Sequence, residues 1–582
     1  MAENKIPDAL KKKLETHFTI IYGEEYVDEC FKKTENLIAK FSLNTEHEVS
    51  FDDVWTHEDH ILITYGDMVQ PNPGEPVSKL SKQNDFLNKY IDDLISTVHI
   101  LPFFPSSSDD GFSVVNYRRV DERLGGWDDI YSLSKDFRLM GDLVMNHTSR
   151  YSEWFKKYLQ NEEPYKNYFI EIDPETDLSM VTRPRSSPLL TPVHTKDGEK
   201  FVWSTFSDDQ IDVNFANTDV LFEFIDIFFF YVSKGLSVIR LDAVAFIWKE
   251  IGTDCIHLKE THEIVKLMRT LVDHYAPHVT IITETNVPHK ENISYFGRGD
   301  ETHMVYQFSL PPLLVHAILT ENASYLTNWA ASLDELPKHC TYFNFTASHD
   351  GIGVRPLQGL VPDDEFNNLV ESMEKKGGFI SEKKNPDGSL SPYEMNITYF
   401  DAFAGENGSQ SLQERRYLCS QIISMSLMGV PGIYFHNLTA TRNNQKGVSI
   451  TGRYRTINRK KWFYDELSDA LSDPDTSTYR IFNSMKSIIK KRKQHPAFHP
   501  FGGQKVHKLS DQIFCLERWD PDETERILVV ANITEETQKL SLKESGINIK
   551  SSKTYNDILT GSQCIEKGTL EMEKFQVVWV KI

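Results

Sequence analysis

Short apolar segments that end in polar residues recur along the chain from residue 61 onward, and amphipathic helical patterns separate them. A segment of about four to eight apolar, β-branched residues is typical of a strand that is buried on both faces. Strands that alternate with helices pair in parallel. We therefore predict eight parallel strands, within residues 61–67, 97–104, 138–147, 235–245, 279–286, 304–311, 342–350 and 429–435.

Eight such strands are the number that closes a (β/α)8 barrel, so the predicted fold class is α/β, a TIM barrel. Two connections are too long to be plain loops, one after the third strand (about 148–230) and one after the seventh (351–410). We expect each of them to form an inserted subdomain. Insertions at the carboxyl ends of barrel strands build walls of the substrate site.

The regions that flank the barrel have different patterns. Residues 1–58 are charged and helix-patterned, notably at 9–18 and 27–41, and predict a helical extension before a catalytic domain at 59–499. From 500 to 582 the pattern changes to short alternating strands, which predicts a C-terminal all-β domain. Its expected strands include residues 513–519, 526–533 and 575–582.

Composition narrows the range of partners. The formal net charge of −22 argues against nucleic acid, and the basic runs at 11–13 and 490–493 are interpreted as solvated helix faces. The N-terminus has no apolar signal segment and no 18 apolar residues run together, so we expect no membrane partner. Six scattered cysteines without a C-x-x-C predict free thiols in a reducing cytoplasm, and nothing suggests a metal site.

The segment at 235–245 carries two charges inside an apolar pattern. Arg240 and Asp242 are two residues apart on a predicted strand, so their side chains share one face. Burying charge is costly unless the charges are paired or used in chemistry. From this segment alone, a structural ion pair and a catalytic centre are equally good interpretations.

Polar residues at the other strand ends favour catalysis. The carboxyl ends of barrel strands meet at one mouth, so Asp242, Glu284 and Asp350 should converge there, and crowding raises the pKa of at least one. In glycoside cleavage one carboxylate attacks the anomeric carbon, while a second, protonated one protonates the leaving oxygen. The remaining polar residues at strand ends are Asp67, Asp109, Asp110, Asn146, His147 and His349.

Four stretches carry a family resemblance: D-L-V-M-N-H (142–147), V-I-R-L-D-A-V (238–244), T-E-T-N (283–286) and A-S-H-D (347–350). They resemble, in order and spacing, the four signature regions of the α-amylase family, glycoside hydrolase family 13. The resemblance implies that Asp242 is the nucleophile, Glu284 the general acid/base and Asp350 the transition-state stabiliser.

The same resemblance implies a glucose-binding set around these carboxylates. Arg240 would keep Asp242 ionised and oriented, with Asp142 as a supporting residue. His147 and His349 would donate to glucose hydroxyls, and Asp109, or its neighbour Asp110, would bind the far hydroxyls. Phe104 is interpreted as core packing rather than as a stacking platform for the sugar.

Further stretches, among them L-I-T-Y-G-D (62–67), H-I-L-P-F-F (99–104) and F-S-L-P-P-L-L-V-H-A (308–317), resemble the sucrose phosphorylase subfamily. Its members transfer glucose to inorganic phosphate, for which guanidinium groups are suitable donors. By this resemblance Arg185 and Arg459 contact phosphate, and Tyr393 lies near them.

Two stretches depart from the sucrose enzymes. S-P-Y-E-M-N (391–396) stands where they have D-L-Y-Q-V-N, and E-T-N-V-P-H (284–289), which begins with the acid/base, stands where they tend to have a Glu-Val-His-type sequence. Together with D-E-T-H-M-V-Y-Q-F (300–308) and the N-terminal extension, the second stretch is more similar to the glucosylglycerate phosphorylases of the subfamily. An acidic glycerate favours a cationic pocket of arginines and His289, which Glu394 opposes unless it is paired.

The expected activity is therefore that of a retaining α-glucoside phosphorylase that acts on an α-glucoside, foremost 2-O-α-glucosylglycerate, and inorganic phosphate. Glucosylglycerol, sucrose and sucrose 6-phosphate remain alternative substrates. An α-glucosidase or transglucosidase, or a non-catalytic barrel of the same family, are alternatives of other classes. We expect no organic cofactor and no metal, and a monomer or a homodimer.

Overall fold

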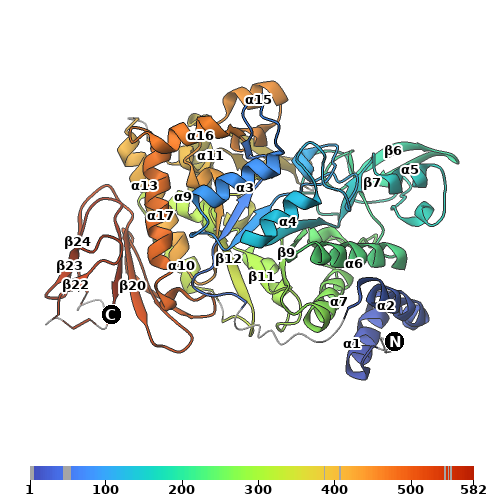
Figure 1. Cartoon of the computed structure of the whole chain (residues 1–582), viewed down its shortest axis with the longest axis horizontal. Coiled ribbons are helices and arrows are strands. Elements are labelled where there is room, and N and C mark those ends of the chain that lie inside the picture. The colour runs from blue at the N-terminus through green and yellow to red at the C-terminus, as the bar shows by residue number, and fades with distance from the viewer. Residues whose placement is uncertain are drawn as a thin grey trace.

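Eight parallel strands close into a barrel at the centre of the computed structural model (Figure 1). The structure describes residues 6–43, 54–333, 335–385, 387–405, 408–542, 546–547, 549–550 and 553–582. The strand order around the barrel is β1-β16-β12-β11-β10-β9-β4-β3, and every predicted segment contributes one strand. They are β1 (Ile61–Thr64), β3 (Thr97–Ile100), β4 (Arg138–Val144), β9 (Leu236–Asp242), β10 (Thr280–Thr283), β11 (Met304–Tyr306), β12 (Thr341–Phe345) and β16 (Val430–Tyr434).

The apolar residues of these strands are buried because helices cover the outside of the barrel (Figure 1). Each βα repeat supplies at least one helix, as a parallel sheet with crossover connections requires. The helices that follow barrel strands are α3 (Lys79–Tyr90), α4 (Trp127–Asp136), α6 (Thr218–Ser233), α7 (Lys259–Tyr275), α8 (His289–Ile293), α9 (Leu310–Thr320), α10 (Ser324–Ala331), α13 (Gln410–Ser426), α14 (Phe435–Leu438), α15 (Gln445–Thr451), α16 (Tyr464–Ser472) and α17 (Ser477–Arg492). A short parallel pair, β2 (Val69–Gln70) and β17 (Trp462–Phe463), joins the first and last repeats.

Two insertions extend the barrel, as the fold class predicts. The first follows β4 and forms the hairpin β6 (Leu190–Thr195) with β7 (Gly198–Trp203), and the pair β5 (His147–Ser149) with β8 (Gln210–Asp212). The second follows β12 and forms a three-stranded sheet in the order β13-β15-β14. Their other elements are α5 (Glu153–Leu159), β13 (Ile352–Gly353), α11 (Asp363–Lys375), β14 (Phe379–Lys384), β15 (Leu390–Asn396) and α12 (Tyr399–Ala402).

The N-terminal helices α1 (Asp8–Tyr22) and α2 (Val27–Phe41) pack on α7 and α6, on the outer side of the barrel (Figure 1). Buried apolar residues of both helices join the main core, so this extension is continuous with the barrel. The ion pair of Lys33 with Asp219, at 2.6 Å, adds a polar contact to α6.

Two four-stranded sheets make up the C-terminal end of the chain. Apolar side chains between these sheets form a separate core, which confirms the expected all-β region. The first sheet has the order β18 (Gly503–Ser510), β19 (Ile513–Trp519), β20 (Arg526–Asn532), β25 (Val577–Lys581), and the second β21 (Gln538–Ser541), β24 (Thr569–Met572), β23 (Gln563–Glu566), β22 (Tyr555–Asn556).

The structure corrects one interpretation of the charge pattern. The basic run at 490–493 is not entirely a solvated face, because Arg492 is fully buried. Its guanidinium donates to the carbonyls of Met425, His57 and Phe498 at 2.8–3.0 Å, so it ties the end of α17 to α13 and to the two segments that carry His57 and Phe498. All six cysteines are free thiols. Within the described residues, no helix has the length and apolar character needed to cross a membrane.

Candidate active site

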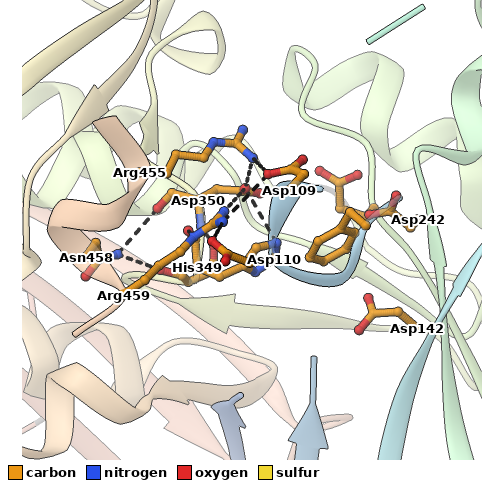
Figure 2. Close-up of polar contacts among 12 residues, drawn as sticks. Asp109, Asp110, Asp142, Asp242, His349, Asp350, Arg455, Asn458 and Arg459 are labelled. Atoms are coloured by element: carbon orange, nitrogen blue, oxygen red, sulfur yellow. Dashed lines mark hydrogen bonds and ion pairs between the residues drawn. The ribbon is translucent and has the colours of Figure 1, made fainter. Parts of the chain in front are cut away.

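The three predicted carboxylates line one pocket at the carboxyl ends of the barrel strands. Asp242 is the last residue of β9, Glu284 follows β10 directly, and Asp350 lies in the loop after β12. Parallel strands bring these positions to one rim although they are distant in sequence. Figure 2 shows Asp242 on one side of this site and Asp350 among several cations on the other.

The guanidinium of Arg240 lies close to the carboxylates of Asp142, Asp242 and Glu284. Its Nη1 lies 2.5 Å from Asp142 Oδ1 and 2.6 Å from Asp242 Oδ1, and its Nη2 lies 3.8 Å from Glu284 Oε2. The register of β4 with β9 explains the first contact, because Asp142 is directly beside Arg240. His99 Nε2, 2.7 Å from Asp142 Oδ2, fixes that carboxylate on its other side. The ion pair therefore holds β4 to β9 and also fixes the position of Asp242 in the pocket.

The pKa values of the three acids shift in different directions. Burial raises the pKa of both Asp242 and Glu284, and a nearby carboxylate adds to the effect, Glu284 for Asp242 and Asp350 for Glu284, while Arg240 opposes it. Burial also disfavours the charge of Asp350, but Arg455 and the neighbouring cationic groups together hold its pKa well below its usual range. Asp242 and Glu284 can thus share one proton, whereas Asp350 stays charged.

The predicted glucose-binding residues surround the same pocket. His147 is buried, with Nε2 2.9 Å from the carbonyl of Phe112. The ring of His349 stacks on Phe112 with centroids 4.6 Å apart and an interplanar angle of 6°. Burial lowers the pKa of His349 to about 3, so this ring is neutral and can exchange hydrogen bonds with a hydroxyl.

Asp109 and Asp110 take different positions. Both have a left-handed backbone, with φ of 51° and 48°, which aspartate tolerates better than most residues. Asp109 lines the pocket, whereas Asp110 pairs with Arg459 Nη1 at 2.5 Å. Asp109 is therefore the member of the pair that can reach a sugar.

Arg459 does not belong to the described residues that line the pocket, and Figure 2 shows it beside Asp110 and His349. Its Nε donates to the carbonyl of His349 at 2.8 Å, and its Nη2 lies 3.8 Å from Asp350 Oδ1. With an exposed fraction of 5%, it braces the loops that carry Asp350 and Asp110. The phosphate contact that the resemblance implied for Arg459 would require this guanidinium to leave those partners.

Residues of the two insertions form one wall of the pocket, which we call the acceptor side. Arg185 lies in the first, and its guanidinium carbon lies 5.2 Å from the ring centroid of Tyr393 in the second. Arg355, which sequence reasoning missed, lines the same wall. From the stretch after Glu284, Asn286 and Val287 line the pocket. His289 is the first residue of α8, and the centroid of its ring lies 6.1 Å from that of Tyr342.

Arg455 is the main residue that the sequence did not reveal. It binds Glu394 with both arms of its guanidinium, Nη2 to Oε1 at 2.5 Å and Nε to Oε2 at 3.1 Å. Its Nη1 lies 2.6 Å from Asp350 Oδ1 and 3.9 Å from Asp109 Oδ1. Glu394 is thus paired with a cation. Its charge therefore does not oppose the binding of an anionic acceptor. The sequence signal for Arg455 is the run R-Y-R-T-I-N-R at 453–459, in which the resemblance pointed only to the last arginine, Arg459.

The ammonium group of a lysine lies among the oxygen atoms beside Asn146. The ammonium of Lys249 lies 2.7 Å from Asn146 Oδ1 and 2.6 Å from Asp212 Oδ2, and it also donates to the carbonyl of Phe246. Burial lowers the pKa of Lys249, while Asp212 opposes that shift. Across the described part of the chain, no group of three or more His, Cys, Asp or Glu side chains is placed to hold a metal ion.

Two other strand-end residues have structural partners. Phe104 is buried and stacks on Tyr231 with centroids 5.0 Å apart, so it packs in the core as expected. Asp67 pairs with Lys461 at 2.5 Å, across the first and last repeats.

Comparisons with known proteins agree with this geometry. The family described as alpha amylase, catalytic domain, matches residues 87–352. The chain is 44% identical to a glucosylglycerate phosphorylase of Spirochaeta thermophila over 90% of each chain, and 40% identical to one of Escherichia coli over 98% of this chain and 100% of that protein. Its fold is similar to that of sucrose 6F-phosphate phosphorylase from Thermoanaerobacter thermosaccharolyticum, with a TM-score of 0.71 at 24% identity over 82% of this chain and 94% of that chain.

Proposed function

We propose that this chain, which belongs to the α-amylase family, glycoside hydrolase family 13, is a retaining α-glucoside phosphorylase whose donor is 2-O-α-glucosylglycerate. Its products are then α-glucose 1-phosphate and free glycerate. The single observation that carries the proposal is the shared Arg240 site, where Asp242 and Glu284 compete for one proton beside a fixed anionic Asp350. The similarity to glucosylglycerate phosphorylases supports the choice of donor.

In the first step Asp242 attacks the anomeric carbon while the bond to the glycerate oxygen breaks. Asp242 is the acid in direct contact with Arg240, at 2.6 Å against 3.8 Å for Glu284, so the negative charge resides on Asp242 and the shared proton on Glu284. Glu284 gives that proton to the leaving oxygen. Asp350 and Asp109 hold the glucose hydroxyls as positive charge develops at the anomeric carbon.

In the second step an oxygen of hydrogen phosphate attacks the same carbon, and the bond to Asp242 breaks. Glu284 recovers its proton from the phosphate, so the net proton moves from phosphate to glycerate. Two inversions give retention of the α configuration. An anionic phosphate oxygen is already a nucleophile and needs less base assistance than water.

The acceptor side supports an anionic aglycone. Arg455 binds Glu394 closely and leaves it only 3.8 Å from Arg185, so the guanidinium groups of Arg185 and Arg355 keep donors for a carboxylate or a phosphate. The nearest carboxylate to Arg355 within the described residues is that of Glu291, 3.9 Å away. Planar guanidinium groups bind both oxyanions with two parallel hydrogen bonds.

The experiment is to incubate the protein with 2-O-α-glucosylglycerate and phosphate and to measure glucose 1-phosphate. Parallel reactions contain glucosylglycerol, sucrose or sucrose 6-phosphate, and the proposed donor should give the highest kcat/KM. Free glucose released at the same rate with and without phosphate would instead identify an α-glucosidase. D242N, tested in the same assay, should form neither product.

We also infer a cytoplasmic enzyme with no nucleic-acid partner. Six free thiols and the net charge of −22 support this inference. A monomer or a homodimer is expected, which light scattering of the purified protein distinguishes.

A further inference from the structure

A second cavity adjoins the active-site pocket on its acceptor side. The two cavities share Arg355 and Tyr393 in their walls, so these residues form the boundary between them. The rest of the second cavity comes from residues 178–184 of the first insertion and 383–385 at the end of β14 in the second. We call this second cavity the vestibule.

The wall of the vestibule is cationic. It contains Arg183, Arg355, Lys383 and Lys384, and its described lining residues include no Asp or Glu. The segment R-P-R at 183–185 thus presents one arginine to each cavity, Arg183 to the vestibule and Arg185 to the pocket. Such a concentration of positive charge is unusual on a chain whose net charge is −22.

These cations are poorly compensated. Arg183 donates to the carbonyl of Ser187, a neutral acceptor. Among the described residues, no carboxylate lies within ion-pair distance of Arg183 or Lys383. Burial lowers the pKa of both side chains, and the charge of Arg355 lowers that of Lys383 further. Partly desolvated cations without a counter-ion create a positive potential that attracts small anions.

We propose that the vestibule is a capture site for inorganic phosphate, which it holds before phosphate passes Tyr393 and Arg355 into the pocket. The inference rests on the proposed phosphorylase function. Arg355 belongs to both walls, so an oxyanion can keep one guanidinium partner while it moves from one cavity to the other. Concentrating phosphate beside the pocket favours its attack over that of water on the glucosyl-enzyme.

The test uses α-glucosyl fluoride, a neutral donor, so that phosphate is the only anionic reactant supplied. The glucosyl-enzyme partitions between water, which gives glucose, and phosphate, which gives glucose 1-phosphate. The product ratio at sub-saturating phosphate measures phosphate capture and is independent of how fast the donor reacts. The variants are R183Q, K383Q and their double variant, with K375Q as the matched control. Lys375 lies on α11 of the same insertion, and its side chain is 76% exposed.

Removing two vestibule charges should lower the ratio of glucose 1-phosphate to glucose about fivefold to tenfold at low salt, since charged clefts raise local anion concentrations by about tenfold or more. K375Q should match the wild type. The difference should shrink at about 0.5 M sodium chloride because salt screens these charges. A ratio in the double variant equal to that of K375Q overturns the capture site. If the wild type forms only glucose at every phosphate concentration, the phosphorylase function itself is wrong.

Discussion

Arg455 gives the sharpest test of the site, because it bonds to two carboxylates that belong to different parts of the reaction. Its guanidinium contacts Asp350, next to the bound glucose, and Glu394, on the acceptor side. We predict that R455Q lowers kcat/KM for phosphorolysis by weakening the electrostatic role of Asp350. R455K should recover part of the loss, because one ammonium can approach only one of the two carboxylates closely.

The magnitude follows from the distances. Two unit charges about 4 Å apart interact by about 4 kcal/mol at an effective dielectric constant of 20, which sets the scale for the pair with Asp350, whose Oδ1 lies 2.6 Å from Arg455 Nη1. Arg459 Nη2, 3.8 Å from Asp350 Oδ1, remains in the variant and retains part of this energy. The expected loss is about 2–3 kcal/mol, or roughly 30- to 150-fold in kcat/KM.

The assay is the pH profile of kcat/KM for phosphorolysis. Arg455 contributes to holding the pKa of Asp350 below its usual range, so its removal raises that pKa. Asp350 acts as an anion, so R455Q should lose activity at a higher pH than the wild type as the solution is acidified. A purely structural role would lower the rate without moving the acid limb of the profile.

R453Q is the matched control, because Arg453 is exposed and only two residues away. It should retain wild-type kinetics and thermal stability. If R455Q remains within about twofold of R453Q, with an unshifted acid limb, the assignment of Arg455 to Asp350 is refuted.

Four further outcomes are expected. D242N should lose about 10⁴-fold or more in kcat while circular dichroism and thermal unfolding stay native-like, and an active or unfolded variant contradicts its role as nucleophile. Prolonged dialysis against EDTA should leave activity unchanged, since Lys249 supplies the cation beside Asn146, and K249M should lose about 3–5 kcal/mol of stability by leaving Asp212 unpaired. The raised pKa of Glu284 stabilises the fold below its unfolded pKa, and this stabilisation is lost as pH rises through the folded value. E284Q mimics the protonated acid, so its melting temperature relative to the wild type should be higher at pH 8 than at pH 4.

The barrel could be predicted because burial on both faces leaves a local signature in each strand. The segment at 236–242 carries its apolar residues and its two charges in seven positions, so both the strand and the shared face of Arg240 and Asp242 follow from local sequence. Once eight strand ends are placed on one rim, Glu284 and Asp350 follow as well.

The contacts between segments around the pocket could not be predicted in the same way, because they join residues that share no local sequence pattern. Arg455 meets Glu394 across 61 residues, and Arg459 meets Asp110 across 349. Both arginines lie in one short segment, and nothing local indicates that the first lines the pocket while the second does not. The stacking of Phe112 on His349 is another contact that depends on how one loop lies over another.

The distribution of compensated and uncompensated charge divides the site into two halves. On the glucose side each described carboxylate has a guanidinium within 4 Å, from Arg240, Arg455 or Arg459, so a neutral sugar meets carboxylates that already have a cation beside them. On the acceptor side Glu394 pairs with Arg455 at 2.5 Å, while Arg185 has Glu394 only at 3.8 Å and Arg355 has Glu291 only at 3.9 Å. An uncharged aglycone would leave these two guanidinium groups weakly paired in a partly desolvated site, at a cost in binding free energy, whereas a carboxylate or a phosphate would give them a close partner. The same two arginines therefore favour both the anionic glycerate as leaving group and the anionic phosphate that replaces it.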